Sequence, residues 1–279
     1  MNRAFGYPSK PEERAAGPLA GGIARNGYQC GMVWGSALAA GAEAYRRFGA
    51  GHRGETASLI AARRIVESFR AQNGAVDCYD LTDTDFNSMA SSRAQMLKYL
   101  LSGKPIGCFR MAARYAPVAF AEIHTALGTE PADAPAAPVS CSALVARRRG
   151  ASDLHAVMVA GFAGGIGLWG GACGALGTAV WLEAMSSDLD YKSREATATS
   201  IVERFLKASG QTFECSRIVG RRFVDVADHA AHVRGGGCAR ILEALSAGRP
   251  TQACPEPRPA ADTNESGVFP VVDQKARWK

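Results

Sequence analysis

An internal repeat constrains the fold of this chain more than any other feature of its sequence. Residues 20–31 read AGGIARNGYQCG and residues 163–174 read AGGIGLWGGACG, with seven of the twelve positions identical. Two further landmarks follow in the same order in both halves: IVESF at 65–69 with IVERF at 201–205, and Gly107-Cys108 with Gly237-Cys238. Matching landmarks in one order predict a duplicated unit.

Composition divides the 279 residues at a Pro- and Ala-rich segment and again near the C-terminus. Residues 129–138 are expected to form a linker between a first repeat at 1–128 and a second repeat at 139–248. Residues 249–279 are polar and rich in proline, and are expected to be a disordered tail.

The segments between the landmarks carry apolar residues at spacings of three and four, which is typical of amphipathic helices. Such stripes are Leu59, Ala62, Val66 and Phe69; Ala198, Val202 and Phe205; and Phe109, Ala112, Ala116 and Ile123. The first two stripes are followed by Gly74 and Gly210, as helix C-termini often are. The sequence therefore predicts a mainly α protein, with two tandem homologous α-helical units packed with pseudo-two-fold symmetry.

The cysteines are the candidate functional residues. The second repeat contains Cys141, Cys173, Cys215 and Cys238, and the first contains Cys30, Cys78 and Cys108, without a counterpart of Cys141. Cys254 lies in the tail. The N-terminus has no apolar signal segment, so a cytoplasmic location is expected, where structural disulfides are rare. Eight cysteines then need another explanation, although each one alone could be a packing residue.

Glycines precede several of these cysteines at expected turn-to-helix junctions. Cys30 and Cys173 follow the Gly-rich turns, and Cys108 and Cys238 follow glycine in the same way. The amide groups and the positive dipole end at a helix N-terminus stabilise a thiolate. A low thiol pKa is therefore predicted, above all at Cys173.

The segment at 161–179, with Cys141 upstream and Cys215 and Cys238 downstream, resembles the C_GCAxxG_C_C family of redox-active proteins. The motif is imperfect in both copies, since Thr178 replaces its last glycine and Met32 replaces its alanine. The resemblance implies redox activity and names no substrate. Because the first copy also lacks one cysteine, it is expected to be a degenerate, structural half.

The functional hypothesis is redox chemistry at Cys173, supported by the other three cysteines of its repeat, with a redox protein of undetermined identity as partner. Two mechanisms stay open. Either Cys173 exchanges with a resolving cysteine, or Cys141, Cys173, Cys215 and Cys238 bind an iron–sulfur cluster or zinc. Cys30, Cys78 and Cys108 form a second candidate site. The alternative is a non-enzymatic scaffold or interaction subunit of a larger assembly with buried cysteines.

Rival patterns are weaker. The formal net charge of +6 comes without interleaved aromatic residues, which disfavours nucleic-acid binding. Residues 165–170 fit the dinucleotide pattern G-x-G-x-x-G, but Ala24 breaks it in the first copy. The uncharged run at 156–182 could span a bilayer, yet Arg25 stands in the matching place, so membrane insertion is disfavoured. His229 and His232 could bind a metal beside Cys238, and Trp34, Trp169 and Trp181 are expected in the core.

Overall fold

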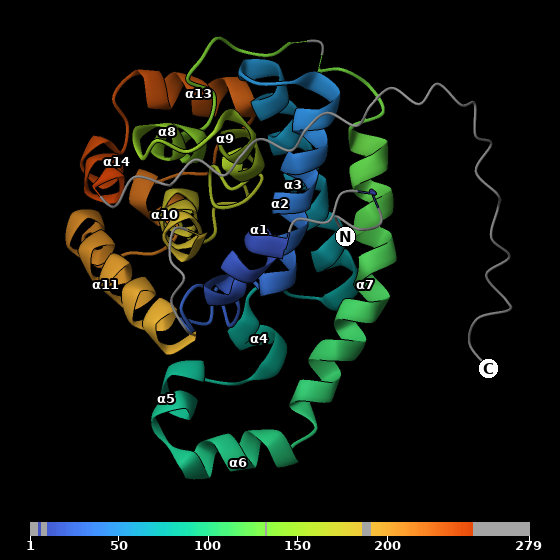
Figure 1. Ribbon diagram of the computed structural model, residues 1–279, viewed down its shortest axis with the longest axis vertical. Helices are drawn as coiled ribbons and strands as arrows, with labels where there is room; N and C mark the ends of the chain where they lie inside the picture. The colour runs from blue at the N-terminus through green and yellow to red at the C-terminus, as the bar shows by residue number, and fades with distance from the viewer. Residues whose placement is uncertain (1–4, 7–9, 132, 186–190, 248–279) are drawn as a thin grey trace, which may run out of the picture.

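The computed structural model describes residues 5–6, 10–131, 133–185 and 191–247 (Figure 1). The expected tail at 249–279, with Cys254, lies outside these residues. Within the described part the chain forms helices, and its β structure is limited to the isolated bridges Gln29–Asp77 and Ala172–Glu214. The prediction of a mainly α fold is confirmed.

The first half contains seven α-helices and one 3-10 turn among the described residues. They are α1 (Lys10–Ala15), η1 (Gly17–Leu19), α2 (Gly31–Phe48), α3 (His52–Asn73), α4 (Cys78–Thr82), α5 (Phe86–Ser91), α6 (Arg93–Leu101) and α7 (Lys104–Ala126), with α8 (Cys141–Arg148) following the linker. The second half continues with α9 (Asp153–Ala160), α10 (Gly174–Met185), α11 (Tyr191–Ser209), α12 (Cys215–Val219), α13 (Val226–Arg234) and α14 (Ala239–Ser246). Both predicted glycine stops hold, since Gly74 caps α3 in the left-handed conformation and Gly210 follows α11.

Small residues let the two halves approach closely at α2 and α9. One face of α2 is almost continuous alanine, and a Cβ added to Gly41 would lie 2.5 Å from the backbone Cα of Met158. A side chain there would push α2 away from α9, so glycine is required by the packing. The core is therefore shared between the halves.

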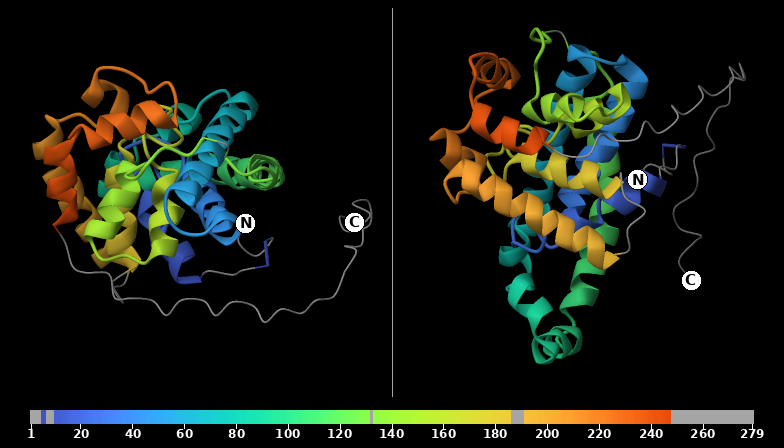
Figure 2. Two further views of the ribbon diagram at one scale, coloured as in Figure 1. Left: turned by 90° about the horizontal axis from the view of Figure 1, so that it is seen from above. Right: turned by 60° about the vertical axis from the view of Figure 1, so that its left-hand side comes forward.

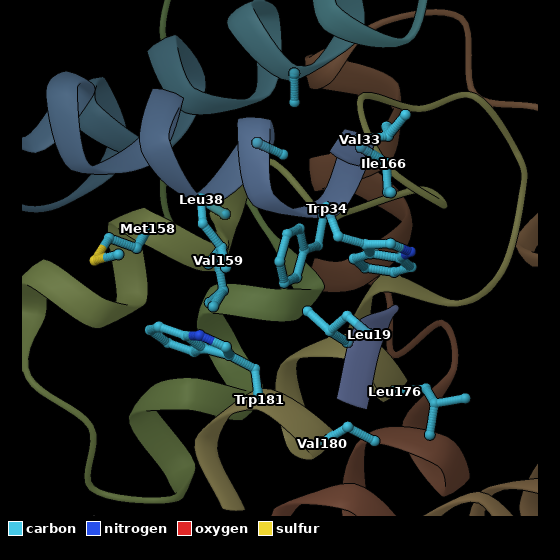
Figure 3. Packing of buried hydrophobic residues seen from close by; sticks show 14 of the residues in the cluster. Leu19, Val33, Trp34, Leu38, Met158, Val159, Ile166, Leu176, Val180 and Trp181 are labelled. Carbon is cyan, nitrogen blue, oxygen red and sulfur yellow. The ribbon is translucent and has the colours of Figure 1, made fainter. Parts of the chain in front are cut away.

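Two tryptophans fill the centre of this shared core, as expected from the sequence (Figure 3). Trp34 of α2 packs edge-on to Phe162 with ring centroids 4.7 Å apart, and its Nε1 donates to the carbonyl of Gln29. Trp181 of α10 donates from Nε1 to the carbonyl of Glu12 in α1. Each buried indole N–H thus has an acceptor, as burial of a polar group requires.

The Gly-rich turns of the two halves have the same backbone conformation. Positive φ angles occur at matching positions: Gly21 and Gly164, Gly22 and Gly165, Ile23 and Ile166, Ala24 and Gly167, Arg25 and Leu168, and Gly27 and Gly170. The amide of Gly27 donates to the carbonyl of Gly21 over 2.9 Å, and that of Gly170 donates to Gly164 over 2.8 Å. This local correspondence is what a duplication would produce. The overall pseudo-two-fold relation between the halves stays a prediction.

The long uncharged run at 156–182 is not one helix. It is divided between α9 and α10 by the second Gly-rich turn. Across the described residues, no helix combines the length and the apolar character needed to cross a bilayer.

Candidate functional site

Six of the seven described cysteines stand at the start of a helix. Cys30 and Cys238 are the N-cap residues of α2 and α14, and Cys173 directly precedes α10. Cys78, Cys141 and Cys215 are the first residues of α4, α8 and α12. The prediction was wrong for Cys108, which lies in the second turn of α7 because that helix begins at Lys104.

Backbone hydrogen bonds join the cysteine-bearing turns of each half in the same way. The amide of Cys30 donates to the carbonyl of Val76 over 2.9 Å, and that of Cys78 donates to Tyr28 over 2.7 Å. In the second half, Cys173 donates to Phe213 over 2.8 Å and Cys215 donates to Gly171 over 2.7 Å. In each half, these bonds hold together two segments that are far apart in sequence, so that the N-termini of two helices lie side by side.

Cys30 and Cys78 form the most polarised pair of thiols. The Cys78 thiol donates a hydrogen bond that lowers the pKa of Cys30, and the N–H of Met32 adds to this against the opposing effect of burial. The same hydrogen bond raises the pKa of Cys78, and burial raises it further. In this pair one sulfur is stabilised as thiolate while its neighbour keeps its proton.

Cys108 completes what we call the first thiol group, with Cys30 and Cys78. It is half-buried, and burial followed by the charge of Cys30 raises its pKa. The hydroxyl of Tyr99 in α6 hydrogen-bonds the Cys108 sulfur and opposes this rise, while burial and Cys108 raise the pKa of Tyr99 to about 12. Sequence reasoning does not single out Tyr99, because the contact depends on how α6 folds back on α7.

The second thiol group consists of Cys141, Cys173, Cys215 and Cys238. Burial, followed by the charge of Cys141, raises the pKa of Cys173 to about 12. Burial also raises the pKa of Cys141 and Cys215, and it raises that of Cys238 to about 11. These thiols are neutral at physiological pH. The expected lowering of a thiol pKa is therefore found at Cys30 and not at Cys173, where desolvation outweighs the helix N-terminus.

The two histidines singled out by the sequence lie against Phe223. His229 is buried, and its Nδ1 is 2.9 Å from the carbonyl of Val139. His232 places Nε2 at 3.7 Å from the Sγ of Cys238. A Cβ on Gly237 would lie 2.2 Å from that nitrogen, so glycine leaves room for the ring. His232 thus contacts one thiol of the second group, whereas His229 bonds the backbone of Val139.

The thiols suit zinc or an iron–sulfur cluster by chemical type. Their arrangement does not, because no three His, Cys, Asp or Glu side chains of the described residues are placed to hold one metal ion. The seven cysteines in that part of the chain are free thiols. We therefore derive no step through a metal.

A cavity of about 440 Å³ lies between α1, α2, α7 and α9. Its lining includes Met32, whose amide contacts the Cys30 sulfur, and Ala112, one helical turn beyond Cys108. Glu12 and Glu13 of α1 stand at the same cavity. The space is large enough for a small molecule or a peptide side chain.

A comparison with known protein families shows which family the first part of this chain resembles. Residues 1–119 match the family model described as "putative redox-active protein (C_GCAxxG_C_C)". This part of the chain belongs to that family. Searches of curated proteins and of solved structures gave no match.

The C_GCAxxG_C_C match falls on the half that the sequence led us to expect as degenerate. It contains Cys30, Cys78 and Cys108, the whole first thiol group. The same family origin for residues 139–248 stays a prediction from their shared landmarks.

Proposed function

We propose that this C_GCAxxG_C_C protein carries out thiol–disulfide exchange, with Cys30 as the attacking thiolate and Cys78 as the resolving thiol. One observation carries the proposal: at the N-cap of α2, Cys30 accepts a hydrogen bond from Cys78 that lowers its own pKa and raises that of its donor. A thiolate beside a protonated thiol is the starting arrangement for a two-step exchange.

The chemistry balances with a partner disulfide as oxidant. The Cys30 thiolate attacks one partner sulfur, so that a mixed disulfide forms and the other partner sulfur leaves as a thiolate. Cys78 then gives its proton to the partner thiolate released in the first step and attacks the Cys30 sulfur, which forms a Cys30–Cys78 disulfide and releases the second partner sulfur as a thiolate. Two electrons pass from the protein to the partner, and a second dithiol protein must return them.

The second thiol group remains a proposed site of slower exchange. Cys141 and Cys238 are half-buried, and Cys238 lies beside His232, while Cys173 and Cys215 are buried. Cys141 and Cys173 affect the pKa values of other sulfurs in the group, so these thiols lie near one another. The burial and the raised pKa values also support the scaffold alternative for this half.

Reaction with the aromatic disulfide 5,5′-dithiobis(2-nitrobenzoate) tests the proposal, because each attack releases a coloured thiolate. In the native protein, attack by Cys30 should release one equivalent, and Cys78 should then expel a second one in a step independent of reagent concentration. Cys78→Ser should stop at the mixed disulfide, and Cys30→Ser should lose both phases.

Cys215→Ser is the matched control, since Cys215 occupies the position in the second half that Cys78 occupies in the first. It should leave both phases unchanged. A full double release from Cys30→Ser would contradict the proposal. Native protein that does not react, with all eight thiols appearing only on denaturation, would favour the scaffold.

A further inference from the structure

The segment formed by α5, α6 and the first two turns of α7 extends from the body of the molecule, as the right-hand view of Figure 2 shows. We call residues 86–110 the arm. Helix α6 has no buried residue, although its sequence, RAQMLKYLL, contains one methionine, three leucines and a tyrosine. Because these apolar side chains do not contribute to the core, their exposure on the surface needs another explanation.

The exposed apolar side chains of the protein are concentrated on the arm. Of nine large hydrophobic residues exposed among the described residues, six belong to it: Met96, Leu97, Leu100, Leu101, Ile106 and Phe109. The four on α6 fall at spacings of four and share one face. Leu101 is 78% exposed and Phe109 is 77% exposed, so both present nearly their whole side chains to solvent.

The charge of the same region has one sign. The sequence contains no aspartate or glutamate between Asp85 and Glu122. Five cationic residues lie in that interval: Arg93, Lys98, Lys104, Arg110 and Arg114. They account for most of the formal net charge of +6. The arm and the α7 turns that follow it therefore combine exposed leucines with a net positive charge, while Asp83 and Asp85, just before the arm, line one pocket with Lys98 and Lys104.

We propose that the arm docks this protein peripherally onto a bilayer surface that contains anionic lipid. Leu, Ile and Phe side chains insert into the boundary between headgroups and acyl chains, and neighbouring Lys and Arg side chains contact lipid phosphates. A nucleic acid would use the cations but leave the exposed leucines in water. Charge complementarity and the aliphatic face together select lipid.

Docking would also place the first thiol group close to the surface. Cys108 lies within the arm, one residue before Phe109, and Tyr99 of α6 contacts its sulfur. The inference does not depend on thiol exchange, because it rests on exposure and charge alone. Its test is therefore separate from that of the proposed function.

Co-sedimentation with vesicles tests the proposal. The full chain should bind vesicles of phosphatidylcholine mixed with phosphatidylglycerol, bind pure phosphatidylcholine vesicles much more weakly, and lose affinity as salt rises. The double substitution Leu100→Gln and Leu101→Gln should reduce binding about tenfold or more, because both side chains are exposed in the free protein and would be buried in the lipid. The double substitution Arg93→Gln and Lys98→Gln should weaken binding to the anionic vesicles and make that binding less dependent on salt concentration.

Val224→Gln is the control, since Val224 is an exposed apolar residue outside the arm and should not affect binding. Circular dichroism should show unchanged helix content in every variant. Wild-type protein that stays in solution with anionic vesicles at low salt would overturn the proposal. The proposal would also be overturned if the protein did not bind vesicles but instead self-associated or bound an acidic protein, and the leucine substitutions abolished that association.

Discussion

The buried side-chain amide of Gln29 accepts a hydrogen bond from the backbone N–H of Ala172 over 3.0 Å. Its Nε2 donates to the carbonyl of Gly165 over 3.2 Å, so one side chain joins the turn before Cys30 to the turn before Cys173. A Cβ on Gly171 would lie 1.9 Å from that nitrogen, which shows how closely the second turn fits the amide.

Substitution of Gln29 should therefore destabilise the protein. Gln29→Met keeps the volume but leaves the Ala172 amide and the Gly165 carbonyl without partners, and we expect a loss of about 1–3 kcal/mol in the free energy of unfolding. Urea denaturation measures it. Gln95→Met, on an exposed face of α6, should change that free energy by less than about 0.5 kcal/mol. Equal effects of the two substitutions would contradict the role of Gln29.

Two glycines of α2 form a matched pair for a test of packing. Gly41→Ala places a methyl group 2.5 Å from the backbone of Met158 and should cost about 1–3 kcal/mol. Gly35 has nothing within 4 Å of an added Cβ, so Gly35→Ala should stabilise the helix by about 0.5–1 kcal/mol. The two substitutions should shift the midpoint of thermal unfolding in opposite directions. An unchanged midpoint for Gly41→Ala would contradict close packing of α2 against α9.

Asp77 should make stability depend on pH. Burial, with help from Asp80 and Glu214, raises the pKa of Asp77 to about 6. The ionised form of Asp77 is disfavoured in the folded state. The contribution of Asp77 to the free energy of unfolding is therefore fully present below a pH of about 4 and is lost as the pH rises through about 6. Asp77→Asn should stabilise the protein by about 1–2 kcal/mol at pH 8, with a smaller effect at pH 4. The exposed Asp133→Asn control should show no such difference, and an equal effect of Asp77→Asn at both pH values would contradict this account.

The polarisation of Cys30 should depend on a donor at position 78. Cys78→Ala removes the hydrogen bond that lowers the pKa of Cys30, so the pH profile of Cys30 alkylation should move to higher pH. Cys78→Ser keeps a donor and should retain most of the lowering. Mass spectrometry of the Cys30 peptide follows the reaction, with Cys215→Ala as the control in the other half. Identical profiles in the wild type and Cys78→Ala would remove the basis for an activated Cys30.

The Gly-rich turns made much of the fold predictable. Turn glycines before Cys30 and Cys173 and stop signals at Gly74 and Gly210 have local causes, so helix starts and ends near them could be located from sequence alone. The error at Cys108 is also local. Gly107 suggests a helix start at Cys108, whereas left-handed Gly103 followed by Pro105 is the stronger signal.

The chemistry was less predictable because it depends on burial. A helix N-terminus favours a thiolate at both Cys30 and Cys173, and sequence cannot tell which sulfur is desolvated among like neighbours. The sequence also does not show that the Cys78 thiol lies beside Cys30, because the two cysteines are far apart along the chain. Phe109 was assigned to an amphipathic stripe with Ile123, yet Ile123 is buried and Phe109 is exposed, because the first turns of α7 extend beyond the body.

A redox titration shows whether Cys30 and Cys78 form a reversible disulfide. The full chain is equilibrated in glutathione buffers between about −300 and −150 mV, alkylated, digested and mapped by mass spectrometry. We expect a linked Cys30–Cys78 peptide that appears and disappears reversibly as a single two-electron couple while helix content stays constant. Cys30 and Cys78 that remain reduced throughout, or that pair with other cysteines, would contradict it.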